Sequence, residues 1–351
     1  MRSKLLEVLR TLSATESRRL TQFLQSPYFN RRDNLLELWE QLQAFAPDYR
    51  HPNLNKSWLF RRVLGTAQPY DERIFNTLSS DFLKLVYEFL ITEDHQQQGV
   101  LREVRLMHSL LDRDLPRHLP AIQRKVDALQ KRLPIQNQLF HYRQYQLQEC
   151  LDREFLTHQS RGADPHLQHL NDHLDLAYWI NKLRIACGML SRNKVVNAGY
   201  QCHFLEPLLH YLESQPALLA ANPALRLHYQ AYQLLHTEIL EEMVGAYAVL
   251  KQALQQYQEV LPSDELYAVY NYALNFCIRQ INSGESNYYQ EVLELYQDML
   301  EHGILLKNEQ LNQWTYKNII TAGIRSAQFE WTEAFIHNYK NHLPLEEQSH
   351  A

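Results

Sequence analysis

Apolar residues recur along most of the chain at spacings of three and four, which is the pattern of amphipathic α-helices. The first such segment covers residues 3–11, and the pattern continues with few interruptions into the last 40 residues. No segment alternates apolar and polar residues between turn signals, as a half-buried strand would. The pattern therefore predicts an all-α protein, with roughly two-thirds to three-quarters of the residues in helices, well above the usual share.

Helix ends in the N-terminal region are marked by capping and turn residues. In FLQSPYFN, residues 23–30, Pro27 should end one helix and Asn30 should cap the next, with Tyr28 and Phe29 in the turn between them. This interpretation makes the stretch a corner between two helices rather than a binding loop. Further helix starts and stops are expected at Ser13 with Glu16, at Asn55, at Gly65 and at Asp71.

Changes in composition divide the chain into four predicted segments. Residues 1–95 form an N-terminal helical bundle, and the polar stretch HQQQG that begins at position 95 is expected to be a linker. Residues 100–160 form a long helical hairpin with a break near its two central prolines. Residues 165–344 form repeated helix hairpins, and residues 345–351 form a disordered tail.

The C-terminal half carries a period in its aromatic residues. One set of aromatic residues is separated by 43 and 44 positions, and a second set by 42 and 42 positions. Helix pairs of this kind bury their apolar faces by stacking on one another. The period predicts three copies of one helix hairpin. The two sets are Tyr229, Tyr272 and Tyr316, and Tyr247, Tyr289 and Trp331.

Two stretches of this region resemble tetratricopeptide-like repeats. They read LYAVYNYALNFCIRQINSGESNYYQEVLELYQDMLEHGIL and TYKNIITAGIRSAQFEWTEAFIHNYKNHLP, and the resemblance covers about residues 165–344. The period is longer than the tetratricopeptide period, and the consensus Trp-Leu-Gly-Tyr set is absent, so extended tetratricopeptide-like or HEAT-like stacking is expected. No polar capping helix follows the last repeat, so we expect a shortened array or a last helix covered by a partner.

The start of the chain also resembles a class of uncharacterised bacterial helical proteins that share an FLxSPYFN turn. This second resemblance implies no activity.

The tetratricopeptide-like resemblance implies an α-solenoid that binds a protein or peptide on its concave face, which is lined by the first helix of each repeat. Asn271, Asn275 and Arg279 follow one another at intervals of four on one such helix, and Lys317 and Thr321 are their counterparts in the next repeat. These side chains can bond a peptide backbone or a carboxylate. The alternative is that they form only the solvated face of a helix.

The uneven distribution of charge along the chain leaves DNA binding open as an alternative function. The net charge is −5, but residues 1–90 carry 13 basic and 10 acidic side chains. Residues 55–90 have a helix-turn-helix outline with Arg61, Arg62 and Arg73 near the turn, as in a DNA-binding transcription regulator. A net charge of +3 is small for a protein that contacts phosphates. The second helix also has apolar residues on all sides, as a buried helix does. Nucleic acid is therefore the less favoured partner.

Residues with catalytic or metal-binding potential form no recognised motif. Phosphate-binding loops, dinucleotide-binding glycine motifs and nucleophile elbows are absent, and the four cysteines form no paired motif. His166, His169 and His173 share a helix face and offer a metal-dependent enzyme as an alternative, but a solvated face is favoured.

We therefore expect a non-enzymatic protein without a cofactor or metal. The N-terminus lacks the features of a signal peptide, and no run of apolar residues is long enough for a membrane span. Membrane association is not expected, and the cytoplasm is the expected location. The identity of the partner and the oligomeric state stay open.

Overall fold

The computed structural model describes residues 3–52, 54–66, 69–131, 135–157, 163–196, 198–259, 261–306 and 309–344. Helices make up 77% of these residues, and none of these residues lies in a β-strand. The all-α prediction is confirmed. The chain divides into two compact units, residues 1–102 and residues 103–351. The predicted tail at 345–351 lies outside the described residues.

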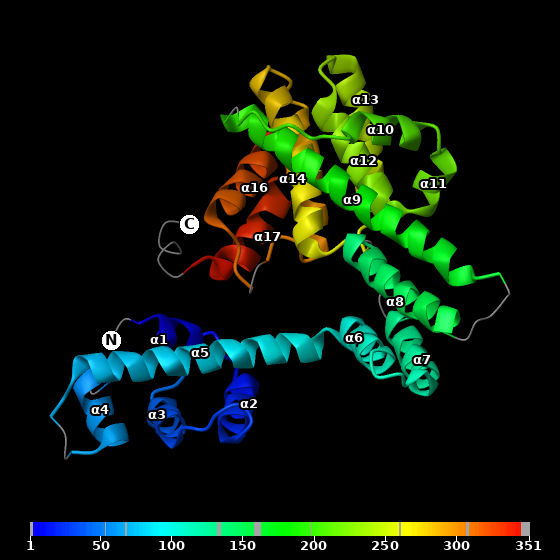
Figure 1. Cartoon of the computed structure of the whole chain (residues 1–351). Coiled ribbons are helices and arrows are strands. Elements are labelled where there is room, and N and C mark those ends of the chain that lie inside the picture. Colours follow the sequence, from blue (N-terminus) through cyan, green and yellow to red (C-terminus); the bar gives the residue numbers. More distant parts are fainter. Residues whose placement is uncertain are drawn as a thin grey trace. The chain divides into compact units, whose positions relative to one another are not determined.

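The first unit is built around one long helix, α5 (Glu72–Gln97), which is drawn in cyan in Figure 1. Four shorter helices each contact α5. The apolar residues of α5 recur at three- and four-residue steps on one side, and Phe75, Phe82 and Phe89 on that side are almost fully buried. The four shorter helices are α1 (Lys4–Leu9), α2 (Ala14–Gln25), α3 (Asp33–Gln43) and α4 (Lys56–Leu64).

Most of the expected helix caps are present in this unit. The Ser13 hydroxyl accepts a hydrogen bond from the backbone N–H of Glu16, whose carboxylate accepts one from the N–H of Ser13, so the capping box is confirmed. The side chains of Asn55 and Asp71 accept backbone hydrogen bonds at the starts of α4 and α5, and Gly65 has a positive φ at the end of α4. These ends were predictable because each cap bonds only to residues within its own first turn.

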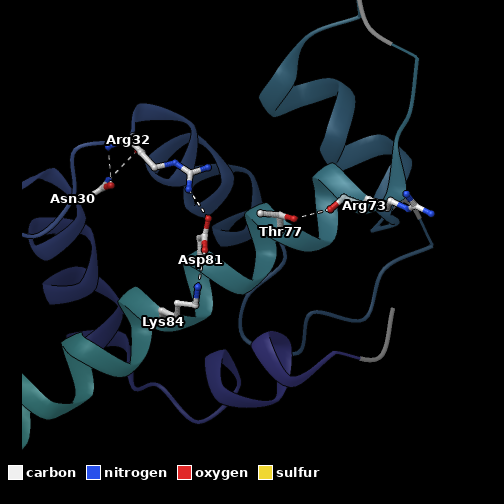
Figure 2. Close-up of polar contacts among 6 residues, drawn as sticks. All are labelled: Asn30, Arg32, Arg73, Thr77, Asp81 and Lys84. Atoms are coloured by element: carbon white, nitrogen blue, oxygen red, sulfur yellow. Dashed lines mark hydrogen bonds and ion pairs between the residues drawn. The ribbon is translucent and has the colours of Figure 1, made fainter.

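The prediction that Asn30 caps the next helix is wrong. Helix α3 begins at Asp33, and the residue before it makes no side-chain cap. Asn30 is instead buried in the turn, where its amide group donates to the carbonyl of Leu24 at 3.0 Å. Its Oδ1 accepts from the N–H of Arg32 at 3.0 Å, as Figure 2 shows. Phe29 stacks on Phe23 with ring centroids 4.1 Å apart. The stretch is a packed corner, as expected, but its asparagine stabilises the turn rather than the helix.

The expected linker at residues 95–99 is also wrong in extent. Helix α5 continues through Gln97, and α6 (Gly99–Leu111) begins two residues later. The predicted break at the central prolines is confirmed, because α6 ends before the short 3₁₀ turn η1 (Pro116–His118) that leads into α7 (Leu119–Gln130).

A long antiparallel hairpin follows, made by α8 (Gln138–Thr157) and α9 (Pro165–Val196). Two helices, α10 (Leu205–Glu213) and α11 (Pro216–Ala221), then lead to the region of the aromatic period.

Three helix pairs carry the aromatic period. In each pair the two helices contact each other, and the pairs are joined by contacts of α12 with α14 and of α15 with α16. Helix α12 also packs against α9 (Figure 1). The predicted helix pairs are therefore present, while their assembly as a tetratricopeptide-like solenoid stays a prediction. The pairs are α12 (Pro223–His236) with α13 (Leu240–Gln256), α14 (Ser263–Asn282) with α15 (Tyr288–Glu301), and α16 (Gln313–Arg325) with α17 (Phe329–Tyr339), followed by η2 (Lys340–His342).

Polar groups join successive pairs at half-buried positions. The Tyr247 hydroxyl donates to the Glu291 carboxylate at 2.7 Å, and the Lys251 ammonium group lies 2.6 Å from carboxylate oxygens of both Glu291 and Glu294. Acidic residues on α15 thus hold the preceding helix pair in register, in addition to the apolar packing between the helices.

Candidate functional site

The partner-binding residues expected on α14 lie on its solvent side. Asn275 and Arg279 are exposed, whereas Asn271 is half-buried and its side-chain amide donates to the carbonyl of Tyr267 at 2.8 Å. On the other side of the helix, residues such as Phe276 are fully buried. Asn275 and Arg279 are therefore available to a ligand, while one donor of Asn271 is already used.

The counterparts on α16 are exposed as well. The Lys317 ammonium group lies 5.6 Å from the centre of the Trp314 ring, and the Thr321 hydroxyl donates to the carbonyl of Lys317 at 2.8 Å. Both contacts stay within α16. Trp314 is itself 67% exposed, so this end of the helix presents an aromatic ring beside a cation.

A cavity of about 390 Å³ lies between α9, α12 and α14. None of the polar and charged side chains in its wall was assigned a binding role from the sequence, although Tyr272 belongs to the aromatic period. The apolar part of the wall includes Ile185, Met189 and Val269. The polar and charged part consists of Arg184, Arg192, Tyr200, His228, Asp264, Glu265 and Tyr272.

The make-up of the cavity wall depends on the relative direction of α9 and α12. The thiol of Cys187 donates to the carbonyl of His228 at 3.6 Å, and the ammonium group of Lys194 donates to the carbonyl of Leu235 at 2.6 Å. Both pairs are separated by 41 residues, so the two helices run in the same direction. This arrangement places residues of α9 and of α12 that are far apart in sequence in the same cavity wall.

Two arginines of α9 give the cavity a positive wall. Arg184 donates through Nε and Nη2 to the neutral side-chain oxygen of Asn181, at 3.2 and 2.7 Å. Within the described part of the chain, neither Arg184 nor Arg192 forms an ion pair with a carboxylate. Burial raises the pKa of Tyr272 to about 12, and the charges of both arginines oppose that rise, so both guanidinium groups lie near this phenol.

A buried polar group also lines the cavity. His228 is only 2% exposed, and its Nε2 lies 3.5 Å from Oε2 of Glu265. The other carboxylate oxygen of Glu265 accepts a hydrogen bond from the Asn137 amide at 2.9 Å. Burial raises the pKa of Glu265, but His228 and Asn137 outweigh it and keep the pKa below its usual value. The Nδ1 atom of His228 has no hydrogen-bond partner among the described residues.

A second basic pair lies further along α9 and α14. Burial lowers the pKa of the Lys194 ammonium group, and the nearby positive charge of Arg279 lowers it further, against an opposing effect of Glu238. Arg279, predicted on α14, is thus close to a residue of α9 that the sequence did not single out. Both residues lie on helices that line the cavity, Lys194 on α9 and Arg279 on α14.

The three arginines of the DNA-binding alternative lie in the first unit. Arg61 and Arg62 are exposed in the last turn of α4, and the Arg62 guanidinium group lies 5.4 Å from the centre of the Trp58 ring. Arg73 is exposed in the first turn of α5, and Figure 2 shows its side chain directed away from the Arg32, Asp81 and Lys84 cluster. DNA binding by this region stays a prediction.

The histidine-rich helix face predicted to be solvated is partly covered. His166 and His173 are half-buried against α8, where their Nδ1 atoms lie 3.0 Å from Gln148 Oε1 and 3.0 Å from His141 Nδ1, respectively. Only His169 is exposed. In the described ranges, no three His, Cys, Asp or Glu side chains converge in a way that would hold a metal ion.

One feature of the cavity is visible in the sequence. Arg184 and Arg192 lie eight residues apart, which places them on one face of a helix two turns apart. His228 and Glu265 carry no such signal, because they meet only through the packing of α12 against α14.

Among the helices that the structure describes, none combines the length and apolar character needed to cross a bilayer. Comparisons of the chain with protein-family models, with curated proteins and with solved structures found no match.

Proposed function

We propose that this protein is a non-enzymatic scaffold that holds a segment of another protein along α9, α12, α14 and α16, called here the binding face. The observation that carries the proposal is the charged cavity between α9, α12 and α14, since α14 also carries the exposed Asn275 and Arg279. A wall with donors, acceptors and apolar side chains suits a peptide, whose backbone is polar and whose side chains vary.

A second cavity favours an elongated ligand over a small molecule. This cavity, of about 670 Å³, is lined by Tyr267 of α14, by Thr315 of α16 and by the segment around Leu305 and Leu306. Asp264 lines both cavities, so they adjoin at the N-terminal end of α14. A chain that follows the binding face from α9 to α16 would pass over both cavities.

The repeated helix pairs support the same function. Repeat arrays present extended surfaces on which a partner makes many small contacts. The resemblance to tetratricopeptide-like repeats also implies a ligand held by the first helix of each pair. On this proposal, Asn275, Arg279 and Lys317 contact the bound segment.

The test is affinity capture from the source cells, read by mass spectrometry, with wild-type protein and an Asn275→Ala/Arg279→Ala/Lys317→Ala variant. The matched control variant is Arg117→Ala/Asn338→Ala/Lys340→Ala, which changes the same residue types at exposed positions outside both cavities. Circular dichroism verifies that both variants are folded. A partner kept by the control and lost by the first variant supports the proposal, and a partner list unchanged by the first variant contradicts it.

A further inference from the structure

We propose that the cavity between α9, α12 and α14 is a carboxylate-binding site and that the segment held on the binding face is an acidic peptide. This inference rests on the proposed function and adds the chemistry of the ligand. It begins from two arginines of the cavity wall that form no ion pair within the described ranges, in a chain whose overall charge is negative.

The positive charges of the cavity wall lack acidic partners. Arg184 bonds only a neutral amide oxygen, and Arg192 forms no ion pair within the described ranges. A guanidinium group binds a carboxylate through two parallel N–H donors, which gives both strength and orientation. Two such groups on one wall therefore suit a ligand with two carboxylates.

The acidic members of the wall do not cancel this preference. Oε1 of Glu265 accepts a hydrogen bond from the Asn137 amide, and Oε2 of Glu265 lies 3.5 Å from Nε2 of the buried His228. Asp264 is exposed at the N-terminal end of α14, where the helix dipole favours a negative charge. Arg184 and Arg192 of α9 therefore remain the cationic groups of the wall without a carboxylate partner within the described ranges.

The basic character continues beyond the cavity. Lys194 and Arg279 bring two positive charges close together at the far ends of α9 and α14. Because the two positive charges repel each other, an anion placed between them would be stabilised by both. The buried and unpartnered Nδ1 of His228 adds a polar contact in the wall of the same cavity.

The spacing of the arginines suggests the spacing of the acidic side chains. Eight helical residues separate Arg184 from Arg192, a distance of about 12 Å along α9 at about 1.5 Å per residue. In an extended peptide, residues i and i+4 share a face and lie about 13 Å apart. We therefore expect a preference for Glu-x-x-x-Glu in an extended segment.

The probe is a fluorescent twelve-residue peptide with two glutamates at this spacing and an amidated C-terminus, and its binding is measured by anisotropy with the full-length protein. The comparison peptides carry glutamine or lysine at the two positions, or two adjacent glutamates. A further glutamine peptide has a free C-terminus, which separates side-chain carboxylates from a chain-end carboxylate.

We expect the spaced glutamate peptide to bind in a salt-sensitive manner and at least tenfold more tightly than the glutamine peptide. Binding should weaken at least tenfold in Arg184→Gln/Arg192→Gln, and less in Arg184→Lys/Arg192→Lys, because lysine keeps the charge without the two-donor geometry. The control Arg117→Gln/Arg124→Gln removes the same charge from α7 and the turn before it, and should bind like wild type.

Three outcomes would overturn the inference: equal binding of glutamate and glutamine peptides, no effect of Arg184→Gln/Arg192→Gln, or no binding of any acidic peptide. Binding of the lysine or glutamine peptide that is lost in Asn275→Ala/Arg279→Ala/Lys317→Ala would leave the scaffold function standing with another ligand chemistry. Loss of the scaffold function itself is decided separately, by the capture experiment.

Discussion

The Nδ1 atoms of His141 and His173 lie 3.0 Å apart across the α8–α9 hairpin. Only one of two nitrogen atoms in such a contact can carry the shared proton. Burial lowers the pKa of His141 to about 4, with a further contribution from His173, and burial also lowers the pKa of His173. The folded hairpin therefore favours neutral imidazoles at these two positions.

This pair predicts loss of stability in mild acid. Above about pH 6.5, where unfolded histidine is also neutral, the full stability is present. As the pH falls from about 6.5 toward about 4, the unfolded chain takes up protons that folded His141 does not, at a cost of about 1.4 kcal/mol per pH unit. Urea unfolding at a series of pH values should show this slope, and His141→Gln should reduce it.

The control for the histidine pair is His169→Gln, which changes an exposed histidine of the same helix and should leave the slope unchanged. A titration of His141 near pH 6.5, followed by NMR in the folded protein, would contradict this interpretation of the pair.

The contact between α16 and α17 predicts that Gly323→Ala is destabilising. A Cβ atom on Gly323 would overlap Oγ1 of Thr332, a buried residue whose hydroxyl donates to the carbonyl of Gln328. We expect a loss of about 1–3 kcal/mol in the free energy of unfolding, because the two helices must separate. Gly245→Ala in α13 meets no atom within 4 Å and should instead stabilise by about 0.5–1 kcal/mol.

Thermal and urea denaturation measure both glycine variants. If the contact is the cause, Thr332→Ala in the Gly323→Ala background should recover part of the loss relative to the sum of the single changes. Equal stability of Gly323→Ala and wild type would mean that α16 and α17 pack differently.

The hydrogen bond between Tyr247 and Glu291 predicts that removal of the Tyr247 hydroxyl lowers the free energy of unfolding. Tyr247→Phe keeps the ring but deletes the donor at 2.7 Å from the carboxylate. We expect a loss of about 1–2 kcal/mol, at the lower end for hydrogen bonds to charged groups, because Lys251 still pairs with Glu291. Tyr178→Phe, at a 42% exposed position of α9, is the comparison and should change the stability little. Indistinguishable unfolding of the two variants would argue against this link between helix pairs.

The corner at residues 26–30 predicts a structural role for Asn30 and none for Tyr28. Asn30→Ala removes bonds to the carbonyls of Leu24 and Arg32 and leaves both acceptors in a buried turn, so we expect a loss of about 1–3 kcal/mol. Tyr28 is 84% exposed, and Tyr28→Ala should leave the stability nearly unchanged. Denaturation of both variants is the measurement. The reverse order of effects would reopen the binding-loop interpretation.

The sequence by itself determined the helices and many of their ends. The capping box at Ser13 and Glu16, the cap at Asp71 and the period of the three helix pairs were all readable. These features depend on hydrogen bonds within one turn or on which side of a helix is apolar, and both are properties of neighbouring residues. Asn30 was misassigned because a good cap and a buried turn residue share the same side-chain chemistry.

Only the tertiary structure decided which polar side chains meet. The predicted Arg279 lies near Lys194 of α9, and His166 and His173 are half-buried because α8 packs against them. His228 and Glu265 come together from two helices, at a distance in sequence that no local pattern records. Such contacts depend on the direction and register in which whole helices pack, and these are fixed by the summed burial of many apolar residues rather than by any single segment.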